Sequence, residues 1–222
     1  MEKLKSLDRI TISQQKEWIE ILSGFETQNK YVVSDDAGNM IYYAAEEDSY
    51  SLFRFFLNNL RPFTLLVLTE SNHDVMRIIR PFRFFFHRVD VVDAQGTSIG
   101  FIQKRFSLLR RKYSVFDSSG KELYQLFGPM LKPWTFIIKN KDIEYGKITK
   151  KWGGFFNEVF TDADDFGVIF PKAWDIRLKA LFIGAVFLID FIHFENQGTE
   201  SGMGSDIDDD ESDEMDMEVE SE

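Results

Sequence analysis

Residues 180–194, ALFIGAVFLIDFIHF, decide how this chain folds. A helix made from this stretch is apolar on every face, so either lipid or the core of the protein must surround it. The stretch comes last, after many short segments with the alternating pattern of β-strands. The choice between lipid and core determines what the protein can do.

Length favours the core. A membrane-spanning helix needs about 20 apolar residues, whereas this stretch has 15 and is interrupted by Asp190. At about 1.5 Å per residue it would be roughly 22 Å long, shorter than a hydrocarbon layer of about 30 Å. The flanks favour insertion instead, because Arg177 and Lys179 precede the stretch and only acidic groups follow it. We expect a core helix over 179–195, with a single pass through 180–194 as the alternative.

The residues that define this helix are Phe182, Ile183, Phe187, Leu188 and Asp190. Asp190 and His193 lie three positions apart and therefore share one helix face. The spacing would permit a catalytic dyad, but polar pairs at helix ends are usually structural, because buried polar groups need hydrogen-bond partners. We predict a satisfied polar pair at the end of the helix.

Composition narrows the classes of function. The 222 residues include no cysteine, which excludes disulfides, cysteine zinc sites, thiol nucleophiles and palmitoylation. The first ten residues, MEKLKSLDRI, lack the apolar region of a signal peptide, so we expect the body on the cytosolic side. The formal net charge is −11, but residues 196–222 hold 12 acidic groups and no basic one. We predict a disordered acidic tail over 196–222 behind a nearly neutral folded body.

The N-terminal segment, 1–29, has a helical pattern. In 14–25 the apolar residues Trp18, Ile21, Leu22 and Phe25 fall at helical spacing. Ser13 suits an N-cap and Gly24 a stop signal. We expect a short amphipathic helix outside the main domain.

From Lys30 onward the pattern has period two and repeats. The turn residues Asp93, Asp117, Asn140 and Asp162 lie 24, 23 and 22 residues apart, each between two strand-like segments. Aspartate, asparagine and glycine at these positions are typical of hairpin turns. Further strands are expected in the hairpin 31–44 and in 63–68 and 75–79, which makes 10 to 12 in all. Closing a barrel removes exposed sheet edges, and an apolar helix would fill such a barrel, so we predict one domain over 30–195.

The acidic loop at 162–167, DADDFG, suggests a cation site. Its carboxylates fall at relative positions 1, 3 and 4 and Gly167 at position 6, as in part of a calcium loop. Ala173 stands at position 12, where a calcium loop has a bidentate glutamate. The alternative is one more hairpin turn in the repeat series.

A run of basic and aromatic residues marks a second candidate site. Arginines surround PFRFFFH (81–87), and a further basic cluster follows at 104–112. Such a mixture suits a membrane interface, where rings enter the headgroup region and cations meet anionic lipid. The alternative is a phenylalanine-rich core strand with solvated arginines on its other face. No base-reading motif supports nucleic acid as the partner. The predicted lipid-contact residues are Arg77, Arg80, Arg83, Phe84, Phe85, Arg88, Arg110, Arg111 and Lys112.

Five longer motifs resemble those of the phospholipid scramblase family. They are GFETQNKY (24–31), IYYAAEE (41–47), RPFTL (61–65), FTDADDFGVIFP (160–171) and KALFIGAVFLIDFIHFE (179–195). The resemblance implies a mainly β, tubby-like fold, a closed antiparallel barrel of about 12 strands around a C-terminal hydrophobic helix. It also implies calcium-stimulated, ATP-independent, bidirectional movement of phospholipids between leaflets, without covalent chemistry, at the cytosolic face of the plasma membrane.

The same resemblance assigns calcium to Asp162, Asp164, Phe166, Val168 and Phe170, the last three through backbone carbonyls. Family members with a palmitoylated cysteine-rich segment carry it where this chain has FRFFF (82–86), so phenylalanine insertion would replace the acyl anchor. The expected partner is a phospholipid membrane rich in anionic lipid. The alternative function is a membrane-surface module that binds anionic lipid or phosphoinositide without transporting it.

Overall fold

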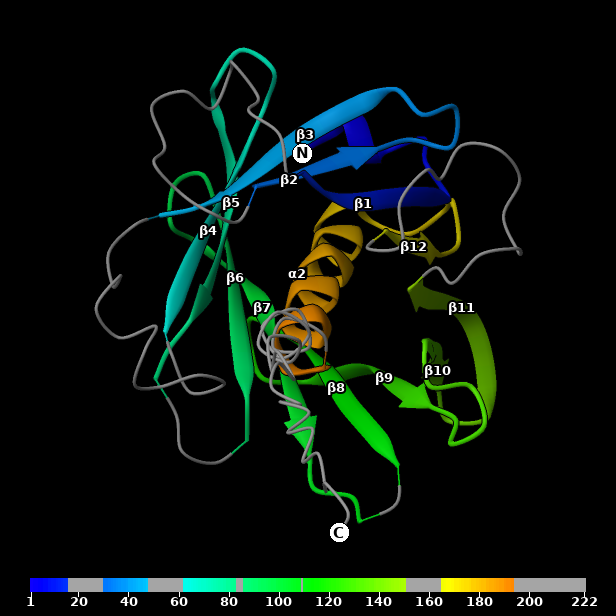
Figure 1. Ribbon diagram of the computed structural model, residues 1–222. Coiled ribbons are helices and arrows are strands. Elements are labelled where there is room, and N and C mark those ends of the chain that lie inside the picture. The colour runs from blue at the N-terminus through cyan, green and yellow to red at the C-terminus, as the bar shows by residue number, and fades with distance from the viewer. Residues whose placement is uncertain (16–29, 48–61, 83–85, 109, 151–164, 194–222) are drawn as a thin grey trace, which may run out of the picture.

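The computed structural model describes residues 1–15, 30–47, 62–82, 86–108, 110–150 and 165–193 (Figure 1). In these ranges twelve antiparallel strands form a closed barrel, in which each strand pairs with its neighbours in sequence and β1 closes the ring against β12. The strands are β1 (Arg9–Gln15), β2 (Lys30–Ser34), β3 (Met40–Glu46), β4 (Phe63–Leu68), β5 (Asp74–Arg80), β6 (Arg88–Asp93), β7 (Ser98–Arg105), β8 (Arg111–Asp117), β9 (Glu122–Gly128), β10 (Thr135–Asn140), β11 (Ile143–Lys150) and β12 (Phe166–Ile169). A short 3₁₀ helix, η1 (Glu2–Leu4), precedes them, and one long helix, α2 (Ile176–His193), follows them.

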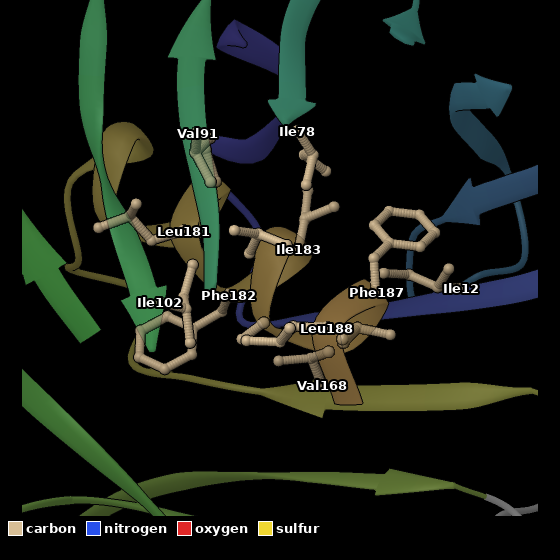
Figure 2. Close-up of a cluster of buried hydrophobic side chains, with 14 of the residues drawn as sticks. Ile12, Ile78, Val91, Ile102, Val168, Leu181, Phe182, Ile183, Phe187 and Leu188 are labelled. Atoms are coloured by element: carbon tan, nitrogen blue, oxygen red, sulfur yellow. The ribbon is translucent and has the colours of Figure 1, made fainter. Parts of the chain in front are cut away.

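The helix α2 runs through the middle of the ring of strands (Figure 1). Every residue from Lys179 to Phe191 is buried, and side chains from the wall and the helix point toward one another (Figure 2). Burying one large apolar side chain stabilises a fold by about 1.5–3 kcal/mol, so this helix supplies much of the core energy. The predicted barrel with a helix inside it is confirmed.

The interior position of 179–191 argues against the alternative in which 180–194 contacts lipid, because these residues are already buried in the barrel. Within the described ranges no helix has the length and apolar character needed to cross a membrane. The helix begins at Ile176, earlier than the predicted Lys179, and is described as far as His193.

Close packing sets how near α2 lies to the wall. A side chain on Gly184 would meet the Cγ2 atom of Val91 at 2.7 Å and the Cδ1 atom of Ile102 at 3.3 Å. The glycine therefore lets the helix approach β6 and β7 more closely than any other residue type would allow. Gly184 thus sets how closely the apolar helix packs against β6 and β7.

The repeated turn chemistry is confirmed by the hydrogen bonds. At the β6–β7 turn the Oδ1 atom of Asp93 accepts from the amides of Gln95 at 3.1 Å and Thr97 at 2.8 Å. Gly96 provides the positive φ of 81° that this turn requires. Asp35 and Asp117 accept the same pair of amide bonds in the β2–β3 and β8–β9 turns. One turn design therefore recurs in the β2–β3, β6–β7 and β8–β9 turns. Asn140 differs, because its side-chain amide donates to the carbonyl of Leu123 at 3.0 Å and the next residue, Lys141, takes the positive φ of 54°. The fourth predicted turn residue, Asp162, lies outside the described residues.

The N-terminal segment differs from the prediction. Residues 9–15 form β1, which pairs with β2 on one side and β12 on the other. Ile10 and Ile12 alternate inward and are buried, while Ser13 pairs with Val32 and is not a helix cap. The barrel domain thus begins before the predicted boundary at residue 30, because β1 satisfies two sheet edges at once. The rest of the expected helix, 16–25, lies outside the described residues.

Candidate functional site

The two ends of the barrel are built differently. At one end, which we name the hairpin end, tight turns join β2 to β3, β4 to β5, β6 to β7, β8 to β9 and β10 to β11. Residues 1–8 and the start of α2 also lie at this end. At the other, the loop end, the remaining strands are joined by longer segments, and the C-terminus of α2 emerges there. The loop end carries the candidate site.

Exposed apolar side chains gather at the loop end. Of the seven large hydrophobic residues that are exposed in the described part of the chain, six lie in its connections. Phe106, Leu108 and Leu131 are 83%, 86% and 94% exposed, values unusual for such side chains. Contiguous exposed apolar surface usually marks a binding site for protein or lipid. The six, which we call the loop-tip residues, are Phe82, Phe86, Phe106, Leu108, Met130 and Leu131.

A basic pocket opens beside these loop-tip residues. Its volume is about 480 Å³, within the range of small-molecule sites, and it is open to solvent. Three of its cations come from neighbouring segments, Lys104 at the end of β7 and Arg110 and Arg111 at the start of β8. Among the residues that the structure describes, no acidic side chain lines it. The lining consists of Lys104, Ser107, Leu108, Arg110, Arg111, Gly128, Met130, Pro133, Trp134 and His193.

Arg111 holds one wall of this pocket in place. Its guanidinium donates to the carbonyl oxygens of Pro133 and, at 3.2 Å, of Lys132. It also stacks over the ring of Phe136 at 4.7 Å. These contacts tie the β9–β10 connection to β8, so Arg111 positions the loop and adds its charge to the pocket.

The end of α2 forms the floor of the pocket. His193 lies there, with its Nε2 atom 2.7 Å from the hydroxyl of Tyr113. Burial and the charges of Lys104, Arg111 and His87 lower the pKa of His193 to about 4. Burial raises the pKa of Tyr113, so its hydroxyl keeps its proton. The floor is therefore neutral at pH 7 and the positive charge comes from the rim.

Asp190, one turn before His193, lies beside the barrel wall. Its Oδ2 atom accepts from the hydroxyl of Tyr31 at 3.3 Å, and its Oδ1 atom lies 3.6 Å from the Nζ atom of Lys150. Both Asp190 and His193 thus have partners from the barrel wall. The expectation of satisfied polar groups at the helix end is met, although each group has a partner of its own from the wall.

The structure separates the predicted lipid-contact residues into three groups. Arg110, Arg111 and Lys112 lie together at the loop end. Arg77 and Arg88 lie on the outer wall, where they pair with Asp74 and Asp90 respectively. Arg83, Phe84 and Phe85 lie outside the described residues.

Arg80 is the exception in this set, because it lies inside the barrel mouth and is 3% exposed. Its guanidinium stacks over the ring of Phe191 at 3.9 Å and lies 2.6 Å from the Nδ1 atom of His87. Burial and the charges of Arg80 and Lys104 lower the pKa of His87 to about 4, so Nδ1 accepts the bond. Arg80 therefore braces the end of α2 and does not face lipid.

The predicted calcium ligands are only partly described. Asp162 and Asp164 lie outside the described residues. Phe166, Val168 and Phe170 point their side chains into the core, and the β12 backbone pairs with both β1 and β11. In such a strand the ladder uses the carbonyls, so a calcium ion would compete with the sheet for the carbonyls of Phe166 and Val168. Across the described ranges, no three His, Asp or Glu side chains come together as a metal site, and calcium binding stays a prediction.

Sequence reasoning missed the β9–β10 connection. Residues 129–134, PMLKPW, contribute Met130 and Leu131 to the loop tips and Trp134 to the pocket. The available signal was two large apolar residues between two prolines, where a plain turn would be polar. Similarly, Phe106 and Leu108 lie between two basic clusters, and only the charged residues of this segment were predicted to contact lipid.

The geometry defines a helix-filled β-barrel with a basic, apolar loop end. The chain belongs to the scramblase family, because the family model described as Scramblase matches residues 1–196. Phospholipid scramblase 1 of Rattus norvegicus is 34% identical over 214 residues, which cover 90% of this chain and 64% of that protein. Phospholipid scramblase family member 5 of Homo sapiens is 33% identical over 210 residues, which cover 88% of this chain and 77% of that protein.

The chain spans 64% and 65% of the rat and mouse phospholipid scramblase 1 sequences that it matches. A solved structure of a protein from Arabidopsis thaliana superimposes with a TM-score of 0.47 at 14% identity, covering 85% of this chain and 93% of that chain. The strand order of the closed barrel, and not this likeness, defines the fold.

Proposed function

We propose that this protein binds the cytosolic face of a membrane, the plasma membrane in particular, through the loop end and moves phospholipids between its leaflets. The observation that carries the proposal is the gathering of six exposed apolar side chains beside a basic pocket, in a member of the scramblase family. The membrane association and the lipid-moving role rest on this family membership.

The loop end has the chemistry for this contact. Inserting a Leu or Phe side chain into the acyl region gains about 1.5–3 kcal/mol, and each Lys or Arg near an anionic surface adds about 1 kcal/mol. Arg105 and Lys112 are exposed at the ends of β7 and β8, next to the loop tips. A few such residues acting together would hold the barrel on an anionic bilayer with α2 pointing toward the surface.

Lipid movement by this protein would need no covalent step and no ATP, since it only lowers the barrier for a headgroup to cross. The barrel offers no path through its centre, because α2 fills it. In our proposal headgroups cross along the loop-end surface, where cations replace part of their hydration. Calcium would stimulate this step through Asp162 and Asp164 in the β11–β12 connection.

Leaflet exchange in sealed vesicles tests the transport. A fluorescent phospholipid in proteoliposomes should become accessible to an external quencher faster with the protein than without it, and faster still with calcium. ATP should change nothing. The absence of any acceleration at about millimolar calcium, the affinity range of weak sites, would count against transport.

A second function, membrane binding without transport, is favoured by the filled barrel. A rigid barrel docked at one end would bind anionic lipid, including phosphoinositide, and serve as a signalling or scaffolding module. Vesicle flotation distinguishes the two functions: flotation without leaflet exchange supports the binding module, and flotation with exchange supports transport.

A further inference from the structure

We propose that the loop-end pocket binds the headgroup of a single anionic phospholipid, with the phosphate between Lys104 and Arg110. The inference deepens the proposed function and rests on it for the identity of the ligand as a lipid. The pocket would bind one lipid specifically, whereas the rest of the loop-end surface would attract lipid only by its overall charge.

Two of the pocket's cations, Lys104 and Arg111, face into the barrel mouth. Strand alternation turns Lys104 toward the inside of the barrel mouth, on the same side as the buried Ile102, while Arg105 points out. On the paired strand β8, Arg111 likewise lies on the same side as the buried Tyr113. Two adjacent strands thus bring inward-facing cations to one mouth, an arrangement that costs desolvation energy without an anion nearby.

The pocket's cations have no acidic counter-charge among the described residues. In the described part of the chain, neither Lys104 nor Arg110 forms an ion pair with a carboxylate, and none lines the pocket. Lys104 is half-buried, and burial lowers the pKa of its ammonium. Arg110 is exposed, and its guanidinium lies over the ring of Phe127 at 5.2 Å. A bound phosphate would supply the counter-charge for both cations.

The C-terminus of α2 opposes an anion here, because a helix end carries roughly half a negative charge. Three cations on the rim outweigh this effect. His193, which lines the pocket from the last turn of the helix, is neutral at pH 7 and adds no charge of its own.

The apolar residues beside the cations match the rest of a phospholipid. Leu108 and Met130 line the pocket and are also 86% and 64% exposed, so the pocket wall continues into the loop tips. A phospholipid has the matching order, a charged phosphate followed by acyl chains. Inorganic phosphate or an acidic peptide would satisfy the cations but leave this apolar rim in water, so the lipid is the occupant that fits both parts.

The test uses the full chain and a short-chain lipid that forms no membrane. Trp134 lines the pocket, and its indole N–H signal in a ¹⁵N spectrum, assigned with Trp134→Phe, reports occupancy. Dihexanoylphosphatidylglycerol should shift this signal saturably and bind more tightly than dihexanoylphosphatidylcholine, inorganic phosphate or polyglutamate. Lys104→Gln with Arg110→Gln should weaken binding by about tenfold or more, since each removes a charged hydrogen bond.

The matched control is Lys121→Gln with Lys141→Gln, two exposed lysines at the hairpin end with the same total charge change. The control should bind like the parent, and thermal unfolding should show both double variants folded. Equal weakening in both variants would reduce the effect to overall charge and overturn the site. An unmoved Trp134 signal, or phosphate or polyglutamate binding as tightly as the lipid, would also overturn it.

This outcome is separable from that of the proposed function, because the assay contains no leaflets. Binding without leaflet exchange would retain the pocket and reject transport. Exchange with an unmoved Trp134 would retain transport and reject the pocket.

Discussion

The hairpin end and the loop end of this barrel differ in how their side chains find partners. At the hairpin end, polar groups are satisfied from within: Asp93 closes its own turn, and the buried Nζ atom of Lys179 donates to the carbonyls of Leu4, Lys5, Leu7 and Lys172 at 2.6–3.1 Å. At the loop end, six large apolar side chains are exposed, and within the described ranges no carboxylate lines the basic pocket. In our proposal the loop end binds a membrane, whereas the hairpin end contributes to stability alone. Substitutions at the two ends should separate stability from membrane binding, and the expected effects on the free energy of unfolding are ordered below.

The largest loss is expected from Lys179→Met. Lys179 is 0% exposed, and methionine would leave four carbonyl oxygens without this donor and release η1 from α2. The free energy of unfolding should fall by about 3–5 kcal/mol, because several carbonyl oxygens lose their donor at about 1–3 kcal/mol each. Urea unfolding measures this. Lys121→Met, at an exposed turn, should change stability by less than about 0.5 kcal/mol, and a similar loss in both variants would contradict the anchoring role of Lys179.

The next largest effect is a loss of stability in acid that arises at the loop end. His87 and His193 have folded pKa values of about 4, below the ordinary value of 6.5. Between these two pKa values the unfolded chain binds more protons than the folded chain. The free energy of unfolding therefore decreases as the pH falls from about 6.5 toward 4. At about pH 5 His193 should account for about 2 kcal/mol, since one pKa unit corresponds to roughly 1.4 kcal/mol.

Unfolding of His193→Asn and of the parent at about pH 7 and pH 5 isolates this contribution from that of the carboxylates. The variant should lose less stability on acidification than the parent. Equal losses in both proteins would show that His193 is not held neutral in the folded state.

A smaller loss is expected at a single turn of the hairpin end. Asp93→Ala removes the acceptor of two backbone amides and the partner of Arg177, whose Nη1 atom lies 3.8 Å from the Oδ2 atom. The free energy of unfolding should fall by about 1–2 kcal/mol, as for the loss of a helix cap of the same chemistry. Asp93→Asn keeps the Oδ1 acceptor and should lose less. Equal losses would assign the effect to the ion pair with Arg177 and not to the turn.

The smallest effect on stability is expected at the loop tips. Leu108→Glu with Leu131→Glu changes side chains that are 86% and 94% exposed, so the free energy of unfolding should change by less than about 0.5 kcal/mol. Flotation with anionic vesicles should instead weaken by more than about tenfold, because each change removes an apolar insertion and adds a repelled charge. Ile143→Glu, at the hairpin end and 60% exposed, is the control and should float as the parent does. Unchanged flotation of the double variant would remove the loop end as the membrane contact.

Much of the fold could be predicted from the sequence because its signals are local. An aspartate followed by a glycine three residues later specifies the turn at Asp93, since the side chain bonds amides only two and four residues away. Only part of the site could be predicted. Arg110 and Arg111 stood out by charge, whereas Met130, Leu131 and Trp134 come from a connection whose neighbours in space are distant in sequence.

The sequence by itself determined that 180–194 must be surrounded, because a helix without a polar face cannot lie in water. It also determined the repeating hairpins that provide the surroundings. Only the tertiary structure decided that the surroundings are the protein itself, since Arg9 has to pair with Ile169 before the barrel can close around α2. The same closure brings the connections after β5, β7 and β9 to one end, where apolar tips and inward-facing cations meet. Such a surface depends on long-range pairing, and no stretch of the chain shows it alone.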